Sequence, residues 1–107
     1  MNTLPKLDVK VRLFEDSSGR PTRLLAFAEL LIADAFVIKG IRVLARDEVG
    51  NDEPFVVFPA ERGQGESRDR WFDLCHPVNT EARAASVGLV LDGYKRAKQK
   101  AADERPA

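Results

Sequence analysis

Hydrophobic and polar residues alternate over residues 7–13, the period-two pattern of a strand with one buried face. Lys10 and Arg12 fall on the polar side of this alternation. The following segment EDSSGRP, residues 15–21, consists of turn-forming residues, so we expect the strand to return as a hairpin. The apolar run LLAFAELLI, residues 24–32, has helix formers, but its short length and its place after a hairpin loop favour a strand.

The β-branched stretch ADAFVIKGIRV, residues 33–43, predicts the central strand of a sheet. Strict alternation here would mix apolar and basic side chains on both faces of the sheet. One extra residue at Gly40 removes this conflict, because a β-bulge shifts the alternation and glycine tolerates its backbone best. The core face would then carry Phe36, Ile38, Ile41 and Val43, and the opposite face Val37, Lys39, Arg42 and Leu44.

Three further segments precede the C-terminal part of the chain. FVVF, residues 55–58, is a short apolar run closed by Pro59, which indicates a strand buried on both sides or placed at a dimer contact. Residues 60–70, AERGQGESRDR, lack large apolar side chains and predict an exposed, mobile loop. Residues 71–78, WFDLCHPV, are interpreted as a last strand, ended by Pro77.

A single helix is predicted over residues 79–100, with Asn79 or Thr80 as its N-cap. Gly88 and Gly93 interrupt it at a cost of about 1 kcal/mol each, so we expect each to mark a close packing contact. Apolar residues recur at helical spacing and should face the sheet. They are Val87, Val90, Leu91 and Tyr94.

The order of these elements predicts an α+β fold, a small antiparallel sheet of four to five strands followed by one C-terminal helix. With 107 residues the chain is expected to form one domain, with the sheet region at 6–78 and tails at 1–5 and 101–107. Cys75 is the only cysteine, which excludes an intrachain disulfide and favours a reducing compartment. Without a signal-peptide pattern or a long apolar run, the protein is expected to be cytoplasmic and not membrane-bound.

Basic and acidic residues balance at 17 each, so net charge gives no reason to expect an acidic partner. Their distribution is uneven: residues 1–46 carry eight basic and five acidic side chains, 47–73 three and eight, and 74–107 six and four. A nucleic-acid site would therefore depend on local clustering of cations rather than on bulk charge.

No pattern in the chain predicts an enzyme, a metal site, a cofactor or a small-molecule substrate. Neighbours on a strand point to opposite faces, so Cys75 and His76 would not form a nucleophile and base pair. Cys75 is interpreted as a small buried side chain, and His76 as an anchor of the corner between strand and helix. The acid pairs Asp52 with Glu53 and Asp69 with Asp73 have no apolar pocket to raise a pKa, so they do not predict acid–base catalysis. The glycines in GQG, residues 63–65, are not followed by the Lys and Ser or Thr of a phosphate-binding loop.

Two groups of cations are candidates for nucleic-acid contact. Three arginines lie in the loop at 60–70, where the neighbouring acids could instead pair with them on the surface. Four cations lie near the helix end, where the helix dipole alone favours positive charge. Trp71, beside the loop, could stack on a base, although a large aromatic residue there also suits a core or a dimer interface. The candidates are Arg62, Arg68, Arg70, Lys95, Arg96, Lys98 and Lys100.

Three stretches together resemble the SpoVG family, the stage V sporulation protein G or septation regulators of bacteria. They are DAFVIKGIRVL at 34–44, FVVFPAERG at 55–63 and FDLCHPVNTEAR at 72–83, and their order and spacing match as well. The resemblance covers roughly residues 7 to 95. This chain departs from the family pattern at Glu61, where a second basic residue would be expected, and at Phe72, where the family commonly has arginine.

The resemblance implies a non-enzymatic regulatory protein that forms a homodimer and binds DNA, and often RNA, at selected sites. In the family, basic residues in the loop after the strand-ending proline contribute to nucleic-acid contact, which here points to Arg62. The rival interpretation is a protein-interaction module in which a sheet edge or the FVVF strand docks a partner. In that case the charges would serve only solubility.

Overall fold

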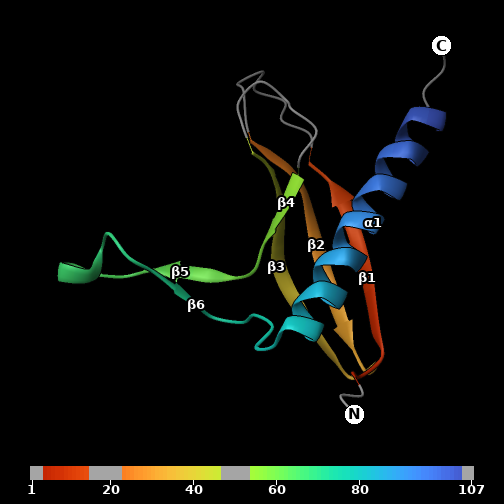
Figure 1. The fold of residues 1–107 in the computed structure, drawn as a ribbon. Coiled ribbons are helices and arrows are strands. Elements are labelled where there is room, and N and C mark those ends of the chain that lie inside the picture. Colours follow the sequence, from red (N-terminus) through yellow and green to blue (C-terminus); the bar gives the residue numbers. More distant parts are fainter. Residues whose placement is uncertain (1–3, 15–22, 47–53, 105–107) are drawn as a thin grey trace.

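The computed structural model describes residues 4–14, 23–46 and 54–104, and the following account is limited to them. A four-stranded antiparallel sheet of order β1-β2-β3-β4 carries helix α1 on one face, and β5 and β6 form a separate two-stranded ribbon (Figure 1). The elements are β1 Leu7–Leu13, β2 Leu24–Ile32, β3 Phe36–Ala45, β4 Pro54–Val57, β5 Ala60–Arg62, β6 Trp71–Asp73 and α1 Thr80–Glu104. The predicted α+β class is confirmed.

The first two strands pair antiparallel, from Leu7 opposite Ile32 to Leu13 opposite Ala26, which confirms the predicted hairpin. The predicted turn at 15–21 lies outside the described residues. The run at 24–32 is a strand and not a helix, because every second residue from Ala26 to Leu30 is buried beneath α1.

The predicted bulge at Gly40 is confirmed. Ala28 pairs with Ile41 and Leu30 with Ile38, so two residues of β3 face a single residue of β2 between these pairs. Gly40 has a φ of +85°, a conformation that residues with a side chain rarely adopt. The bulge brings Ile41 and Val43 onto the core face, where each is fully buried.

Phe36 is the exception on this face. It was expected in the core, but it is 73% exposed. It pairs with Ile32 at the end of the sheet, beside the turn at 33–35, and not in the middle where the helix covers the strands. Alternation determines the face on which a side chain lies, whereas its burial depends on what covers that part of the sheet.

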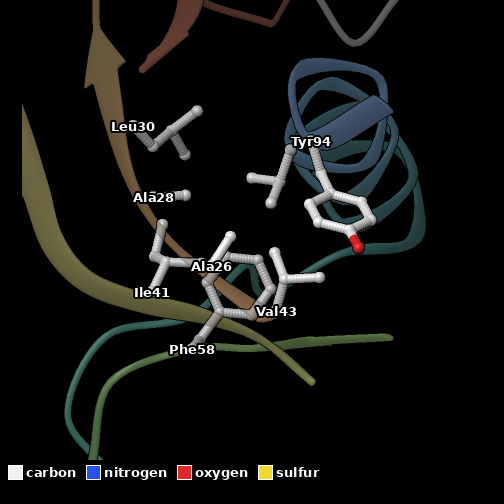
Figure 2. Close-up of a cluster of buried hydrophobic side chains, with 8 residues drawn as sticks. Ala26, Ala28, Leu30, Ile41, Val43, Phe58 and Tyr94 are labelled. Carbon is white, nitrogen blue, oxygen red and sulfur yellow. The ribbon is translucent and has the colours of Figure 1, made fainter. Parts of the chain in front are cut away.

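The hydrophobic core lies between α1 and the inner face of β2 and β3 (Figure 2). Tyr94 points from the helix towards the sheet, and Phe58 closes the cluster beyond the end of β4. Each fully buried aliphatic side chain contributes about 1.5–3 kcal/mol relative to its exposed state. The core residues are Ala26, Ala28, Leu30, Ile41, Val43, Phe58, Val90 and Tyr94.

Helix α1 begins as predicted, because the side-chain oxygen of Asn79 accepts a hydrogen bond of 2.7 Å from the backbone N–H of Ala82. The four predicted sheet-facing residues, Val87, Val90, Leu91 and Tyr94, all belong to the core or pack against it. The helix ends at Glu104 and not at residue 100, since the predicted tail continues the helical hydrogen bonding for another turn.

The two helix glycines differ. A Cβ atom at Gly93 would lie 2.7 Å from Cγ2 of Val11 and 3.2 Å from Cγ1 of Val9, so the predicted close contact with the sheet is confirmed there. A Cβ atom at Gly88 would have no heavy atom within 4 Å, so the same prediction was wrong at Gly88. The helix therefore approaches the sheet most closely where it crosses β1.

The segment between β4 and the helix differs most from the predictions. FVVF lies mostly in β4, which among the described residues pairs only with β3 and is therefore an edge strand. The predicted burial on both sides was wrong, because the residues of β4 are only half-buried. The expected loop at 60–70 begins with β5, and the expected strand at 71–78 is reduced to β6, Trp71–Asp73. Both changes have one cause: β5 and β6 pair with each other and leave the main sheet. In the described part of the chain, no helix combines the length and apolarity needed to cross a membrane.

Candidate nucleic-acid interface

Residues 60–73, here called the arm, form a ribbon that extends away from the sheet and helix (Figure 1). Ala60 pairs with Asp73 and Arg62 with Trp71. The ribbon continues one step further, where the N–H of Gly63 donates to the carbonyl of Arg70 at 2.8 Å. A short 3₁₀ turn, Gly65–Ser67, closes the tip.

The tip depends on glycine at position 63. A Cβ atom there would lie 2.2 Å from the carbonyl oxygen of Ser67, and this backbone atom cannot move aside without opening the turn. The N–H of Arg70 also donates to that carbonyl oxygen at 2.9 Å. The sequence feature that suggested a mobile loop, two glycines among polar residues, thus belongs to a defined turn.

The three predicted arginines of the arm, Arg62, Arg68 and Arg70, are all exposed. The guanidinium group of Arg62 donates from Nε to the carbonyl of Arg68, so it also holds the two sides of the tip together. Within the described residues, no ion pair joins these arginines to the neighbouring acids Glu61, Glu66 and Asp69. Mutual neutralisation, the alternative that the sequence left open, is therefore not found along the arm.

The other predicted cations are Lys95, Arg96, Lys98 and Lys100, which are exposed on the C-terminal half of α1. This half of the helix and the arm extend in different directions from the sheet (Figure 1). The structure therefore does not bring the seven predicted residues together on one surface of a single chain.

A third group of cations lies on the face of the sheet opposite α1, here called the open face. In register across three strands, Arg12 of β1 lies opposite Phe27 of β2, and Phe27 lies opposite Arg42 of β3. The guanidinium carbon of Arg12 lies 5.6 Å from the ring centroid of Phe27, a cation–π contact. The open face comprises Asp8, Lys10, Arg12, Phe27, Glu29, Leu31, Val37, Lys39, Arg42, Leu44, Phe55 and Val57.

The open-face cations were not among the predicted contact residues. The signal that places them is nonetheless present in the sequence, since alternation puts Lys10 and Arg12 on one side of β1. The bulge at Gly40 does the same for Lys39 and Arg42 on β3. What alternation alone does not reveal is that β2 brings an aromatic ring between the two basic strands.

A crevice of about 400 Å³ lies where the arm leaves the edge of β4. Trp71, 64% exposed, lines it from the arm, and Arg83 enters from the first turns of α1. The guanidinium carbon of Arg83 lies over the ring of Phe58, 5.9 Å from its centroid. Trp71 is therefore an exposed aromatic residue, and the core position considered from the sequence is excluded.

Cys75 and His76 lie in the segment between β6 and the helix and not on a strand. Cys75 is half-buried rather than buried, because this segment leaves the main sheet. Nδ1 of His76 lies 2.9 Å from the carbonyl oxygen of Pro77, which agrees with its expected place at the corner before the helix. No group of three metal-ligating side chains occurs among residues 4–14, 23–46 and 54–104.

The fold and these surfaces define a class of small α+β proteins, in which one helix covers an antiparallel sheet and a two-stranded ribbon with exposed arginines extends from the sheet. The family model named SpoVG matches residues 4–96. The chain belongs to the SpoVG family.

Curated relatives agree with this assignment. The septation protein SpoVG 2 of Listeria monocytogenes serotype 4b is 36% identical to this chain over 90 residues, which cover 83% of this chain and 76% of the relative. SpoVG of Anaeromyxobacter is 33% identical over 85 residues, 78% of this chain and 79% of the relative. SpoVG of Desulforudis audaxviator is 32% identical over 89 residues, 82% and 88% of the two chains. All three relatives are named as septation proteins.

Proposed function

We propose that this protein is a non-enzymatic regulator that binds DNA, and also RNA, at selected sites and acts as a homodimer. The observation that carries the proposal is the arm, which presents Arg62, Arg68 and Arg70 to solvent without an ion pair to its own acids. Arginine side chains bind phosphates and can read base edges, and a ribbon that extends from the body can reach a groove.

Dimer formation is supported by exposed apolar side chains in and just after the arm. Trp71 is 64% exposed and Val78 is 86% exposed, and Phe72 and Leu74 between them are also exposed. A two-stranded ribbon is marginally stable alone, and large exposed apolar patches mark interaction surfaces. A second copy that covered these side chains would stabilise the arm. It would also give the pair two arms, and with them twice the number of cations.

Replacing Arg62, Arg68 and Arg70 by alanine should weaken binding to duplex DNA at least about tenfold near 0.1 M salt. Each phosphate contact contributes a salt-dependent increment, so the slope of log affinity against log salt should fall by about three per chain. The measurement is fluorescence anisotropy with a labelled pool of random duplexes, repeated over several salt concentrations.

The matched control is the neutralisation of acids on the same arm, Glu61→Gln with Glu66→Gln. It nearly preserves the size of both side chains but removes negative charge, so duplex binding should become tighter. If the arginine variant and the wild type bind equally, the arm is not the contact surface. If the wild type binds no nucleic acid at low salt, the protein is not a nucleic-acid-binding regulator.

The dimer is tested by replacing Trp71 and Phe72 with serine. Interface aromatics carry much of the binding energy of a contact, so the dimer dissociation constant should rise at least about tenfold in sedimentation velocity. Phe36→Ser is the control, since Phe36 is more exposed than either residue, at 73%, but lies outside the arm. A wild type that sediments as a monomer at every concentration would contradict the dimer.

A protein-interaction module is the second candidate, favoured by the same exposed side chains and by the outer edge of β4, which pairs with no other strand that the structure describes. A sheet edge with unpaired N–H and C=O groups can accept a strand from a partner. The salt titration separates the two functions, because docking of an apolar partner would depend weakly on salt, whereas phosphate binding depends on it steeply.

A further inference from the structure

We propose that the open face of the sheet is a second binding surface, and that its ligand is single-stranded nucleic acid with a base stacked at Phe27. This inference rests on the proposed nucleic-acid function and extends it to a surface that the arm does not include. It is drawn from the row of side chains formed by Arg12, Phe27 and Arg42.

The row places one aromatic ring, that of Phe27, between two arginines. Phe14 packs edge-on against Phe27, with ring centroids 5.9 Å apart and an interplanar angle of 83°. Arg12 lies over the Phe27 ring on the same face of the sheet. Neighbouring strands are about 4.8 Å apart, so the backbones at Arg12 and Arg42 lie on either side of Phe27, about 10 Å from each other. A nucleobase can stack on an exposed aromatic ring, while guanidinium groups beside the ring contact adjacent phosphates.

Charge favours a polyanion over a second copy of this chain. The open face carries four cations, Lys10, Arg12, Lys39 and Arg42, and two acids, Asp8 and Glu29. Asp8 is already paired with Lys6, at 3.8 Å. If two copies met through this face, the cations would outnumber the acids on both sides, and like charges would be buried together. A phosphate backbone neutralises them instead.

Shape also agrees with exposed bases rather than with a small enclosed ligand. Two shallow hollows of about 220 and 310 Å³ lie on either side of Glu29. The first is bordered by Lys10, Arg12 and Phe27, and the second by Asp34, Lys39 and neighbouring apolar residues. A base within a duplex has both faces covered by its neighbours, so only an unpaired base can stack on the sheet.

The test compares the affinity for a labelled single-stranded 12-mer with that for the corresponding duplex. Phe27→Leu keeps an apolar side chain and the net charge, yet it should weaken single-strand binding about tenfold, because it removes the stacking surface. Arg12→Gln with Arg42→Gln should weaken it by a similar factor. Duplex binding should change less than about threefold for Phe27→Leu, since this variant leaves the arm intact. Arg42 also lines the crevice beside Trp71, so the arginine variant is judged by its loss of single-strand binding. Arg12→Lys, which keeps the charge but loses the planar group, should give an intermediate loss.

Urea titration of each variant ensures that altered binding does not reflect unfolding. The open face is not a binding surface if two results occur together. These are unchanged single-strand affinity in Phe27→Leu and in Arg12→Gln with Arg42→Gln, and loss of that affinity when the three arginines of the arm are replaced by alanine. The proposed function would still stand. If these substitutions dissociate a dimer in sedimentation velocity, the face is an interface between copies, and the inference is overturned. A wild type that binds neither strand form would overturn the proposed function as well.

Discussion

Replacing Ile41 with alanine is expected to lower the free energy of unfolding by about 3 kcal/mol. Ile41 is completely buried, with an accessible fraction of 0%, and its side chain points from β3 into the cluster in Figure 2. The substitution removes three heavy atoms from the core. The bulge at Gly40 fixes the position of residue 41 on the inner face of β3, and α1 covers this face. The surrounding structure relaxes only partly, so a cavity adds to the lost transfer free energy.

Urea denaturation followed by far-UV circular dichroism measures this loss, at one fixed protein concentration because the stability of a dimer depends on concentration. Val37→Ala is the matched control. Val37 lies on the same strand but on the open face and is 47% exposed, so its loss should be about 0.5 kcal/mol. Equal losses for the two variants would show that Ile41 is not in the core.

Replacing Gly93 with valine is expected to cost about 2 kcal/mol, although valine has the higher helix propensity. The new Cβ atom alone would lie 2.7 Å from Cγ2 of Val11, closer than carbon atoms can approach. The helix would have to lift from β1 or shift along it, and either movement would loosen the contacts of Val90 and Tyr94 with the sheet.

Gly88→Ala provides the comparison within the same helix. No atom would contact the added methyl group, so the gain in helix propensity should raise the free energy of unfolding by about 0.5–1 kcal/mol. Both variants are measured by the same urea titration. A stabilising effect at both positions would contradict the close approach of α1 to β1, and a loss at both would indicate that Gly88 is also packed.

The separation of the cations has a consequence for how a nucleic acid would be bound. In one chain, the arm, the helix end and the open face point in different directions, so a single straight duplex cannot contact all three (Figure 1). If both proposals hold, the arms of a dimer contact duplex and the open faces contact unpaired bases. Such a division would suit a target in which paired and unpaired segments lie close together, as in a folded RNA.

Much of the main sheet and the helix follows from local pattern. Alternation in β1 and β2 determines which side chains can be buried, and the conflict around Gly40 has only one simple solution, an extra residue. The N-cap at Asn79 and the apolar spacing of α1 are likewise local properties. These predictions succeed because each depends on residues a few positions apart.

The arm and the surfaces depend on contacts between distant segments. Residues 60–62 are too short and too polar to indicate a strand, and they become one only because residues 71–73 pair with them. The same pairing removes 71–78 from the main sheet and exposes Trp71. The row of Arg12, Phe27 and Arg42 requires the registers of two strand pairs at once.

The amino-acid sequence by itself thus determined the family, the α+β class, the faces of the strands and the start of the helix. Only the tertiary structure decided where the cations lie relative to one another, which of the two helix glycines is packed, and that an aromatic ring separates two arginines on the open face. The physical reason is range: propensity, capping and alternation act between neighbours in the chain, whereas a binding surface is assembled from strands whose pairing brings remote residues together.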